Sequence, residues 1–196
     1  MQARWSWLEA LTLTALAGAL GCGGFGKVNQ GRVVAWDAEK GLVTLILDSN
    51  NREPGKPRYD VLPPVTVRLP EDPAAMGPVP QAGGLIELDI RNRKAVIFEA
   101  ASQSLKAIPL ETLELVENVG RDDPRVARVR FPVVDRAKKV ITLYWAKKRQ
   151  LITFAVPEEC LGLPASTWIM GDEVRYYFKD PGQALRMMNV TKTEVS

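Results

Sequence analysis

Two stretches of this sequence, far apart in the chain, match one another without a gap. Residues 37–45 (DAEKGLVTL) lie over residues 135–143 (DRAKKVITL), and the match keeps an aspartate, a lysine, a threonine and a leucine in register. In both stretches a short polar segment leads into alternating apolar residues, a pattern that predicts a β-hairpin. The chain is therefore restricted to folds that contain this strand, turn and strand twice.

Two further pairs of segments match in the same order along the chain. Their apolar residues stand at alternate positions, the period of a half-buried strand, and the pairs are 65–71 with 152–158 and 86–91 with 174–179. Matches in a conserved order indicate an internal duplication. We therefore predict a first β module over residues 31–124 and a second over residues 125–196.

Alternation and turn residues predict five strands in each module. They are 31–37, 42–48, 65–69, 85–91 and 94–99 in the first, and 129–135, 139–146, 150–156, 173–179 and 183–190 in the second. The expected fold is all-β, with two tandem small barrel-like modules that are OB-like or SH3-like; a sandwich that both modules share stays open. The first module also carries an inserted loop, residues 48–64, and a connecting segment after its last strand.

The N-terminus has the pattern of a bacterial lipoprotein signal. Arg4 precedes an apolar stretch, and residues 19–22 (ALGC) resemble the site at which a peptidase cuts before an acylated cysteine. The apolar stretch is too short for a membrane span, which needs roughly 20 residues. We predict a signal peptide over residues 1–21, a lipid on Cys22 and a tether over residues 22–30. The protein is then exported, lipid-anchored and periplasm-facing, with the outer membrane favoured over the inner.

The mature chain also contains four segments that together resemble a known family. They are GKVNQGRVVAWD, VLPPVTVRLPEDPAAMGP, FPVVDRAKKVITLY and GDEVRYYFKDPGQALRMMNVTKT. The family consists of uncharacterised bacterial lipoproteins and is best known from sulfate-reducing bacteria. The resemblance implies a location in the cell envelope, and it brings no activity, cofactor or site residue.

The composition argues against most catalytic chemistry. The sequence has no histidine and only two cysteines, Cys22 and Cys160, which removes the commonest general base and any pair of C-x-x-C metal knuckles. We expect no cofactor, no metal site and no catalytic residue. Two weaker alternatives stay open. One is a hydrolase that uses adjacent carboxylates, Glu71-Asp72, Glu158-Glu159 or Asp172-Glu173. The other is a metal ion bound by oxygen atoms of the inserted loop.

Charge is distributed unevenly along the chain. Residues 23–124 hold 12 basic and 15 acidic side chains, whereas residues 125–196 hold 13 basic and 7 acidic ones. We predict a surface for an anionic partner at Lys147, Lys148, Arg149, Arg175 and Lys179, with a merely solvated face as the alternative. Export argues against nucleic acid as the partner. The leading hypothesis is a non-enzymatic envelope scaffold or adaptor with a protein partner; the second is a binding module for an anionic glycan, a lipid head group or a metal ion.

Overall fold

The computed structural model of this protein describes residues 26–50, 53, 55–111 and 113–193. Within them the chain forms twelve strands and three short 3₁₀ turns, so the prediction of an all-β fold is confirmed. The predicted signal peptide and the lipidated Cys22 lie outside the described residues. The predicted tether ends earlier than residue 30, because the first strand already begins at Lys27.

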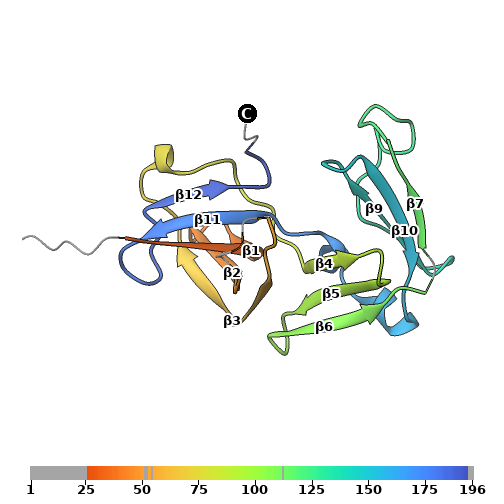
Figure 1. The fold of residues 1–196 in the computed structure, drawn as a ribbon, viewed down its shortest axis with the longest axis horizontal. Coiled ribbons are helices and arrows are strands. Elements are labelled where there is room, and N and C mark those ends of the chain that lie inside the picture. The colour runs from red at the N-terminus through yellow and green to blue at the C-terminus, as the bar shows by residue number, and fades with distance from the viewer. Residues whose placement is uncertain (1–25, 51–52, 54, 112, 194–196) are drawn as a thin grey trace, which may run out of the picture.

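A five-stranded antiparallel sheet forms the first lobe of the molecule (Figure 1). Its strands, in spatial order, are β12 (Arg186–Asn189), β11 (Glu173–Phe178), β1 (Lys27–Asp37), β2 (Leu42–Asp48) and β3 (Tyr59–Arg68). The sheet is curled, since Arg68 at the end of β3 forms a parallel bridge with Gln183, just before β12. Its concave side holds one apolar core, with Val33, Leu45 and Tyr176 among the buried residues.

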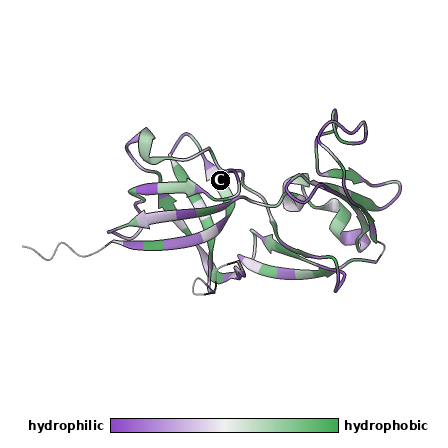
Figure 2. Ribbon diagram, turned by 45° about the horizontal axis from the view of Figure 1, so that its top comes forward, coloured by the Kyte–Doolittle hydropathy of each residue, from purple (hydrophilic) through white to green (hydrophobic). Residues whose placement is uncertain are grey.

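Two smaller sheets form the second lobe. One has the order β4 (Leu85–Asp89), β5 (Lys94–Glu99) and β6 (Ser104–Pro109); the other has the order β7 (Leu113–Val116), β10 (Gln150–Ala155), β9 (Val140–Trp145) and β8 (Val133–Asp135). Buried and partly buried residues alternate along β5 and β10, and Figure 2 shows many hydrophobic positions on the strands of this lobe. The apolar sides meet in a second core around Ile97, Phe154 and Trp168.

Three short 3₁₀ turns follow two of the strands, β3 and β10. Turn η1 (Pro73–Ala75) lies in the first lobe, and turns η2 (Glu158–Gly162) and η3 (Ala165–Trp168) lie in the second. The last two turns contribute Cys160, Leu161 and Trp168 to the core of the second lobe.

The second lobe is inserted into the first. The chain leaves the first sheet after β3, builds β4 to β10, and then returns to place β11 beside β1, with Gln30 opposite Arg175. This pairing differs from the predicted order of two consecutive five-strand units. Segments 86–91 and 174–179 resemble one another in sequence, yet they belong to different sheets. The alternation of apolar and polar residues decides which side chains of a strand face a core, but it does not decide which other strand pairs with it.

The two connections between the lobes lie side by side. The Gly83 amide donates to the Val33 carbonyl (3.1 Å), and the Asp172 amide donates to the Gln81 carbonyl (2.8 Å). Glycine is required at this crossing, because a Cβ atom on Gly171 would lie 1.9 Å from the Val33 carbonyl oxygen. A third apolar cluster, formed by Ile46 and Tyr59 of the first lobe and Ile86 of the second, closes the seam between the lobes.

Five hairpins in the two lobes use the same turn. In each, four residues separate the last strand pair, which is Asp37 with Leu42, Asp89 with Lys94, Glu99 with Ser104, Asp135 with Val140, or Trp145 with Gln150. The last of the four residues has a positive φ, at Gly41, Arg93, Gln103, Lys139 and Arg149. The hairpins predicted at residues 37–45 and 135–143 are both present.

The inserted loop is shorter than predicted. Strand β3 begins at Tyr59, so the connection from β2 covers residues 49–58 instead of the expected 48–64. Pro63 and Pro64 suggested a break in the strand, but β3 is an edge strand, where a missing N–H group is tolerated. The Asp48 carboxylate holds the base of the loop by accepting hydrogen bonds from the amides of Asn50 (2.8 Å) and Arg58 (2.7 Å).

Candidate anionic-partner surface

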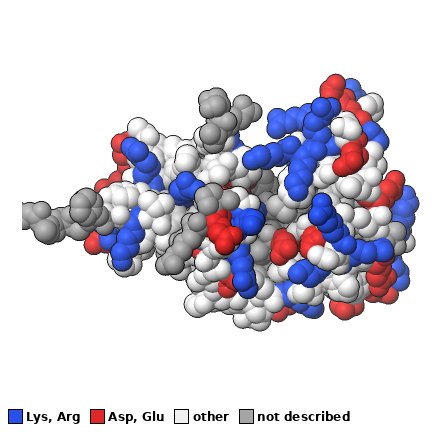
Figure 3. All heavy atoms as spheres, in the orientation of Figure 1, with Lys and Arg blue, Asp and Glu red and all other residues white. Residues whose placement is uncertain are grey.

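Seven exposed cationic side chains gather at one end of the second lobe. They come from the long loop between β7 and β8 and from the turn between β9 and β10; we call them the basic loop cluster. Its members are Arg121, Arg125, Arg128, Arg130, Lys147, Lys148 and Arg149. Figure 3 shows a corresponding concentration of basic side chains over the upper part of this lobe.

The loop and the turn are held together by contacts that the local sequence provides. The Val119 amide donates to the Arg149 carbonyl (2.8 Å), and the Tyr144 hydroxyl donates to the Val119 carbonyl (3.0 Å). Phe131 packs against the Tyr144 ring at 5.9 Å between centroids. Val126 is buried and fixes the middle of the loop. The cations therefore project from a backbone that β9 and β10 position.

Most of these cations form no ion pair. Among the described residues, only Arg125 of the seven forms an ion pair, with Asp123 at 2.6 Å. The hydrogen bonds from Arg125 lower the pKa of Asp123 to about 2. The Lys148 ammonium lies 3.7 Å from the centre of the Trp145 ring, a cation–π contact that leaves its charge at the surface. The same loop also holds Glu117, Asp122 and Asp123, so the cluster keeps a net positive charge that is only partly compensated.

The structure divides the predicted surface between the two lobes. Lys147, Lys148 and Arg149 lie at the β9–β10 turn, as expected, but Arg175 is on β11 and Lys179 follows β11 in the first lobe. The four arginines between residues 121 and 130 were missed. Four arginines within ten residues form a basic segment that is visible in the sequence. It was overlooked because this segment was interpreted as a connection between the two modules.

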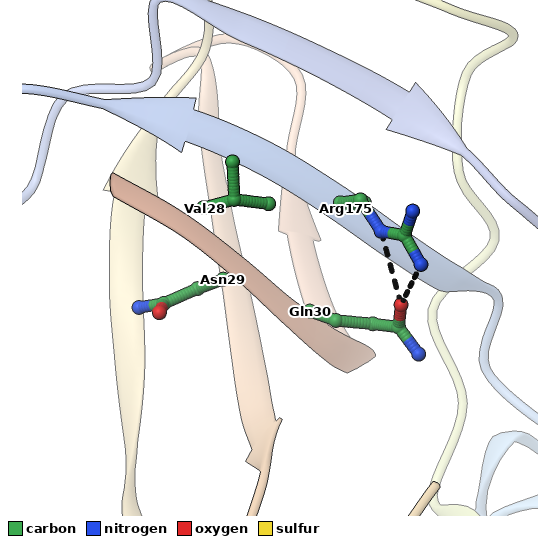
Figure 4. A pocket seen from close by; sticks show the side chains of 4 residues that line it. All are labelled: Val28, Asn29, Gln30 and Arg175. Carbon is green, nitrogen blue, oxygen red and sulfur yellow. Dashed lines mark hydrogen bonds between the residues drawn. The ribbon is translucent and has the colours of Figure 1, made fainter. Parts of the chain in front are cut away.

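Arg175 lies in a shallow depression of about 400 Å³ on the first lobe (Figure 4). Its guanidinium donates through Nε (3.1 Å) and Nη2 (2.7 Å) to Gln30 Oε1. Gln30 in turn donates through Nε2 to the Glu173 carboxylate (2.7 Å). Val28 and Asn29 complete the lining. Because the depression is open and its polar groups bind one another, it offers no enclosed small-molecule site of the usual kind.

A second polar group lies in the seam between the lobes. Arg32 donates through Nη1 to the Gly171 carbonyl (2.8 Å), and its guanidinium covers the Tyr59 ring. Burial lowers the pKa of Arg32 and raises the pKa of Tyr59. Neither Arg32 Nε nor the Tyr59 hydroxyl makes a hydrogen bond of normal geometry among the described residues, although the hydroxyl lies near the Gln30 and Glu173 side chains. These groups are enclosed by the seam, so they are part of the lobe contact.

The acidic pairs have structural partners. Asp72 caps η1 by accepting from the Ala74 amide (2.9 Å), and Glu158 binds Lys139 (2.9 Å). Buried Asp172 accepts from the Gln81 amide and from Asn189 Nδ2, both at 2.8 Å. Each pair thus has at least one member that supports local structure.

The described part of the chain contains no group of three or more acidic, cysteine or histidine side chains arranged for a metal ion. Cys160 is buried, and burial raises the pKa of its thiol. None of the helical segments in residues 26–50, 53, 55–111 and 113–193 has the length and apolar character that a membrane crossing requires.

The fold and the surface define an all-β protein of two interleaved lobes with a basic end on the inserted lobe. Residues 24–196 match the model of a family described as a domain of unknown function (DUF4881), and the chain belongs to that family. No curated protein and no solved structure matches the chain.

Proposed function

We propose that this protein is an exported, lipid-anchored and non-enzymatic adaptor that holds an anionic polysaccharide close to the membrane. The observation that carries the proposal is the basic loop cluster, in which six of seven exposed cations have no ion-pair partner among the described residues. Fields of this kind attract anions over distances of about 8–10 Å at moderate ionic strength.

A polymer fits this surface better than a compact ligand or a folded protein. The cations lie on an exposed loop and turn, where a chain with repeated negative charges can meet several of them at once. A specific protein interface has an apolar or aromatic centre. Here the aromatic rings already have internal roles, because Tyr144 binds Val119 and Trp145 carries Lys148 on its face.

The place of the predicted anchor supports the role of an adaptor. Five residue steps join Cys22 to Lys27, and a chain of that length spans at most about 17 Å. The start of β1 would therefore stay near the bilayer. The second lobe lies at the other end of the long axis (Figure 1), so the polysaccharide would be held away from the lipid.

Binding of the full-length lipidated protein to dextran sulfate, with neutral dextran of equal length as the reference, tests the proposal. We expect the triple substitution K147E/K148E/R149E to lower the affinity for dextran sulfate at least about tenfold, or 1.4 kcal/mol. The control K56E/R91E/K106E makes the same change of charge at exposed positions outside the cluster. Equal losses in both variants, or equal binding of neutral dextran, would refute the role of the cluster. Binding of polyglutamate but not of dextran sulfate would indicate an acidic protein partner instead.

We also infer that the first lobe is a small barrel of the OB-like or SH3-like kind and that its hairpins share an origin with those of the second lobe. The bridge between Arg68 and Gln183 supports the first inference, since it joins the two edges of the sheet at one end. The common register of the 37–45 and 135–143 hairpins supports the second.

A further inference from the structure

The convex side of the first sheet has an unusual composition near the start of β1. Strand register places Val28, Tyr177 and Arg186 in one row across β1, β11 and β12, and places Gln30, Arg175 and Met188 in the next. The neighbouring residues Tyr176 and Met187 point to the core on the other side. These two rows form what we call the outer β-face.

The outer β-face exposes apolar side chains between cations. Val28 is 53% exposed and Met188 is 39% exposed, although both lie within paired strands. Arg175 and Arg186 are also exposed, and neither forms an ion pair among the described residues. Apolar side chains interspersed with arginine and tyrosine are typical of surfaces that lie in the head-group region of a bilayer.

The length of chain before β1 limits where this face can be. Val28 follows Cys22 by six residues, which span at most about 20 Å when fully extended. A lipid on Cys22 would therefore keep the outer β-face within reach of the membrane at all times. At such high effective concentration, even weak contacts between the face and the lipid would be occupied.

We propose that the outer β-face lies on the phospholipid surface into which the Cys22 lipid is inserted; the proposal rests on the lipid anchor of the proposed function. Val28, Tyr177 and Met188 enter the head-group layer. Arg175 and Arg186 bind lipid phosphates, for which the planar guanidinium is well suited. The contact fixes the orientation of the first lobe relative to the bilayer.

Labels at single introduced cysteines test this contact in the full-length lipidated protein. V28C and M188C carry an environment-sensitive fluorophore, and L115C, on β7 of the second lobe, is the control with a similar exposure of 37%. Cys160 is buried and Cys22 is acylated, so neither competes for the label. The protein is placed in vesicles of phosphatidylethanolamine and phosphatidylglycerol that contain a head-group spin label.

We expect the spin label to quench V28C and M188C at least threefold more than L115C, and aqueous iodide to show the opposite order. When R175E/R186E is added to V28C, iodide should quench the V28C label as strongly as it quenches the L115C control label. Equal iodide access at all three positions, in protein that stays on the vesicles, would overturn the inference alone. A chain that leaves the vesicles and has no acyl mass on Cys22 would overturn the proposed anchor as well.

Discussion

The guanidinium carbon of Arg32 lies 4.4 Å from the centre of the Tyr59 ring. Arg32 is on β1, Tyr59 begins β3, and Tyr59 packs against Ile86 of the second lobe. A cation–π contact in a desolvated place contributes up to about 2 kcal/mol. The pair therefore connects two strands of the first lobe at the place where the second lobe covers them. We expect the Tyr59 ring to contribute more to the stability of this contact than the Tyr59 hydroxyl does.

Replacing Tyr59 with phenylalanine should leave the protein as stable as before or more stable. The Tyr59 hydroxyl is buried without a hydrogen bond of normal geometry among the described residues, so its removal relieves a desolvation cost of about 1–3 kcal/mol. Tyr144→Phe is the matched control: its hydroxyl donates to Val119, and we expect a loss of about 1 kcal/mol. Urea unfolding at pH 7 measures both, and a destabilised Tyr59→Phe variant would show that the hydroxyl has a partner.

The same residue should make the protein sensitive to alkali. Burial raises the pKa of Tyr59 above its usual value near 10. Below pH 10 the phenol is protonated in the folded and unfolded chains alike, so it has no effect on the pH dependence. Above pH 10 the unfolded chain releases a proton that the folded chain keeps, and the free energy of unfolding falls as the pH rises. Melting temperatures between pH 8 and pH 11 should fall less in Tyr59→Phe than in the parent protein.

Asp123 should titrate far below an ordinary aspartate. Hydrogen bonds from Arg125 lower the pKa of Asp123 to about 2, and the pair holds the turn at the start of the basic loop. Carboxyl carbon shifts, recorded by NMR from pH 6 to pH 1.5, should give this midpoint. In Arg125→Ala the pKa should rise toward about 3.9. An unchanged midpoint in that variant would mean that backbone amides, not Arg125, set the value.

The crossing between the lobes should not accept a methyl group. In Gly171→Ala the new Cβ would lie 1.9 Å from the Val33 carbonyl oxygen, so backbone must move, and we expect a loss of about 3 kcal/mol. Gly162→Ala is the control, because its Cβ would meet no atom within 4 Å, and its effect should stay within about 0.5 kcal/mol. Chemical denaturation compares the two; similar stabilities would mean that the crossing is pliable.

Binding of dextran sulfate should weaken as salt increases, because each phosphate- or sulfate-bound cation displaces counterions. The logarithm of the affinity should fall linearly with the logarithm of salt concentration, and the slope should be shallower in K147E/K148E/R149E. Titration at four salt concentrations gives both slopes. Parallel lines for parent and variant would exclude these three side chains from the contact.

Local features of the fold could be predicted from the sequence. The strands at 42–48 and 94–99 have the predicted bounds, because alternation and turn residues act over a few positions. The pairing of β1 with β11 could not be predicted, since it joins residues that are distant in the chain and depends on the whole core. Strand β7 was interpreted as part of a connecting segment for the same reason, since it pairs with the distant β10. Strand β6 forms a local hairpin with β5, and it lies in the same predicted connecting segment.

The candidate surface was predictable only in part. The β9–β10 turn could be predicted, because the charged run of Lys147, Lys148 and Arg149 stands between two segments with strand patterns. The other part of the predicted surface, Arg175 and Lys179, lies on the first lobe, although the sequence placed both residues in the same module as the turn. Their distance from the cluster results from the return of the chain to the first sheet, which charge counting along the sequence does not reveal.

The insertion of one lobe into the other also sets an order for folding. The first sheet is incomplete until β11 has joined β1, and the two strands are separated by the entire second lobe. Strands β4 to β10 are contiguous, so their contacts require shorter chain closures and can form earlier. Strands β1 to β3 can pair with one another as soon as they are available, but the edge of β1 that β11 covers stays open until the second lobe has been made. The first lobe is thus begun first and finished last.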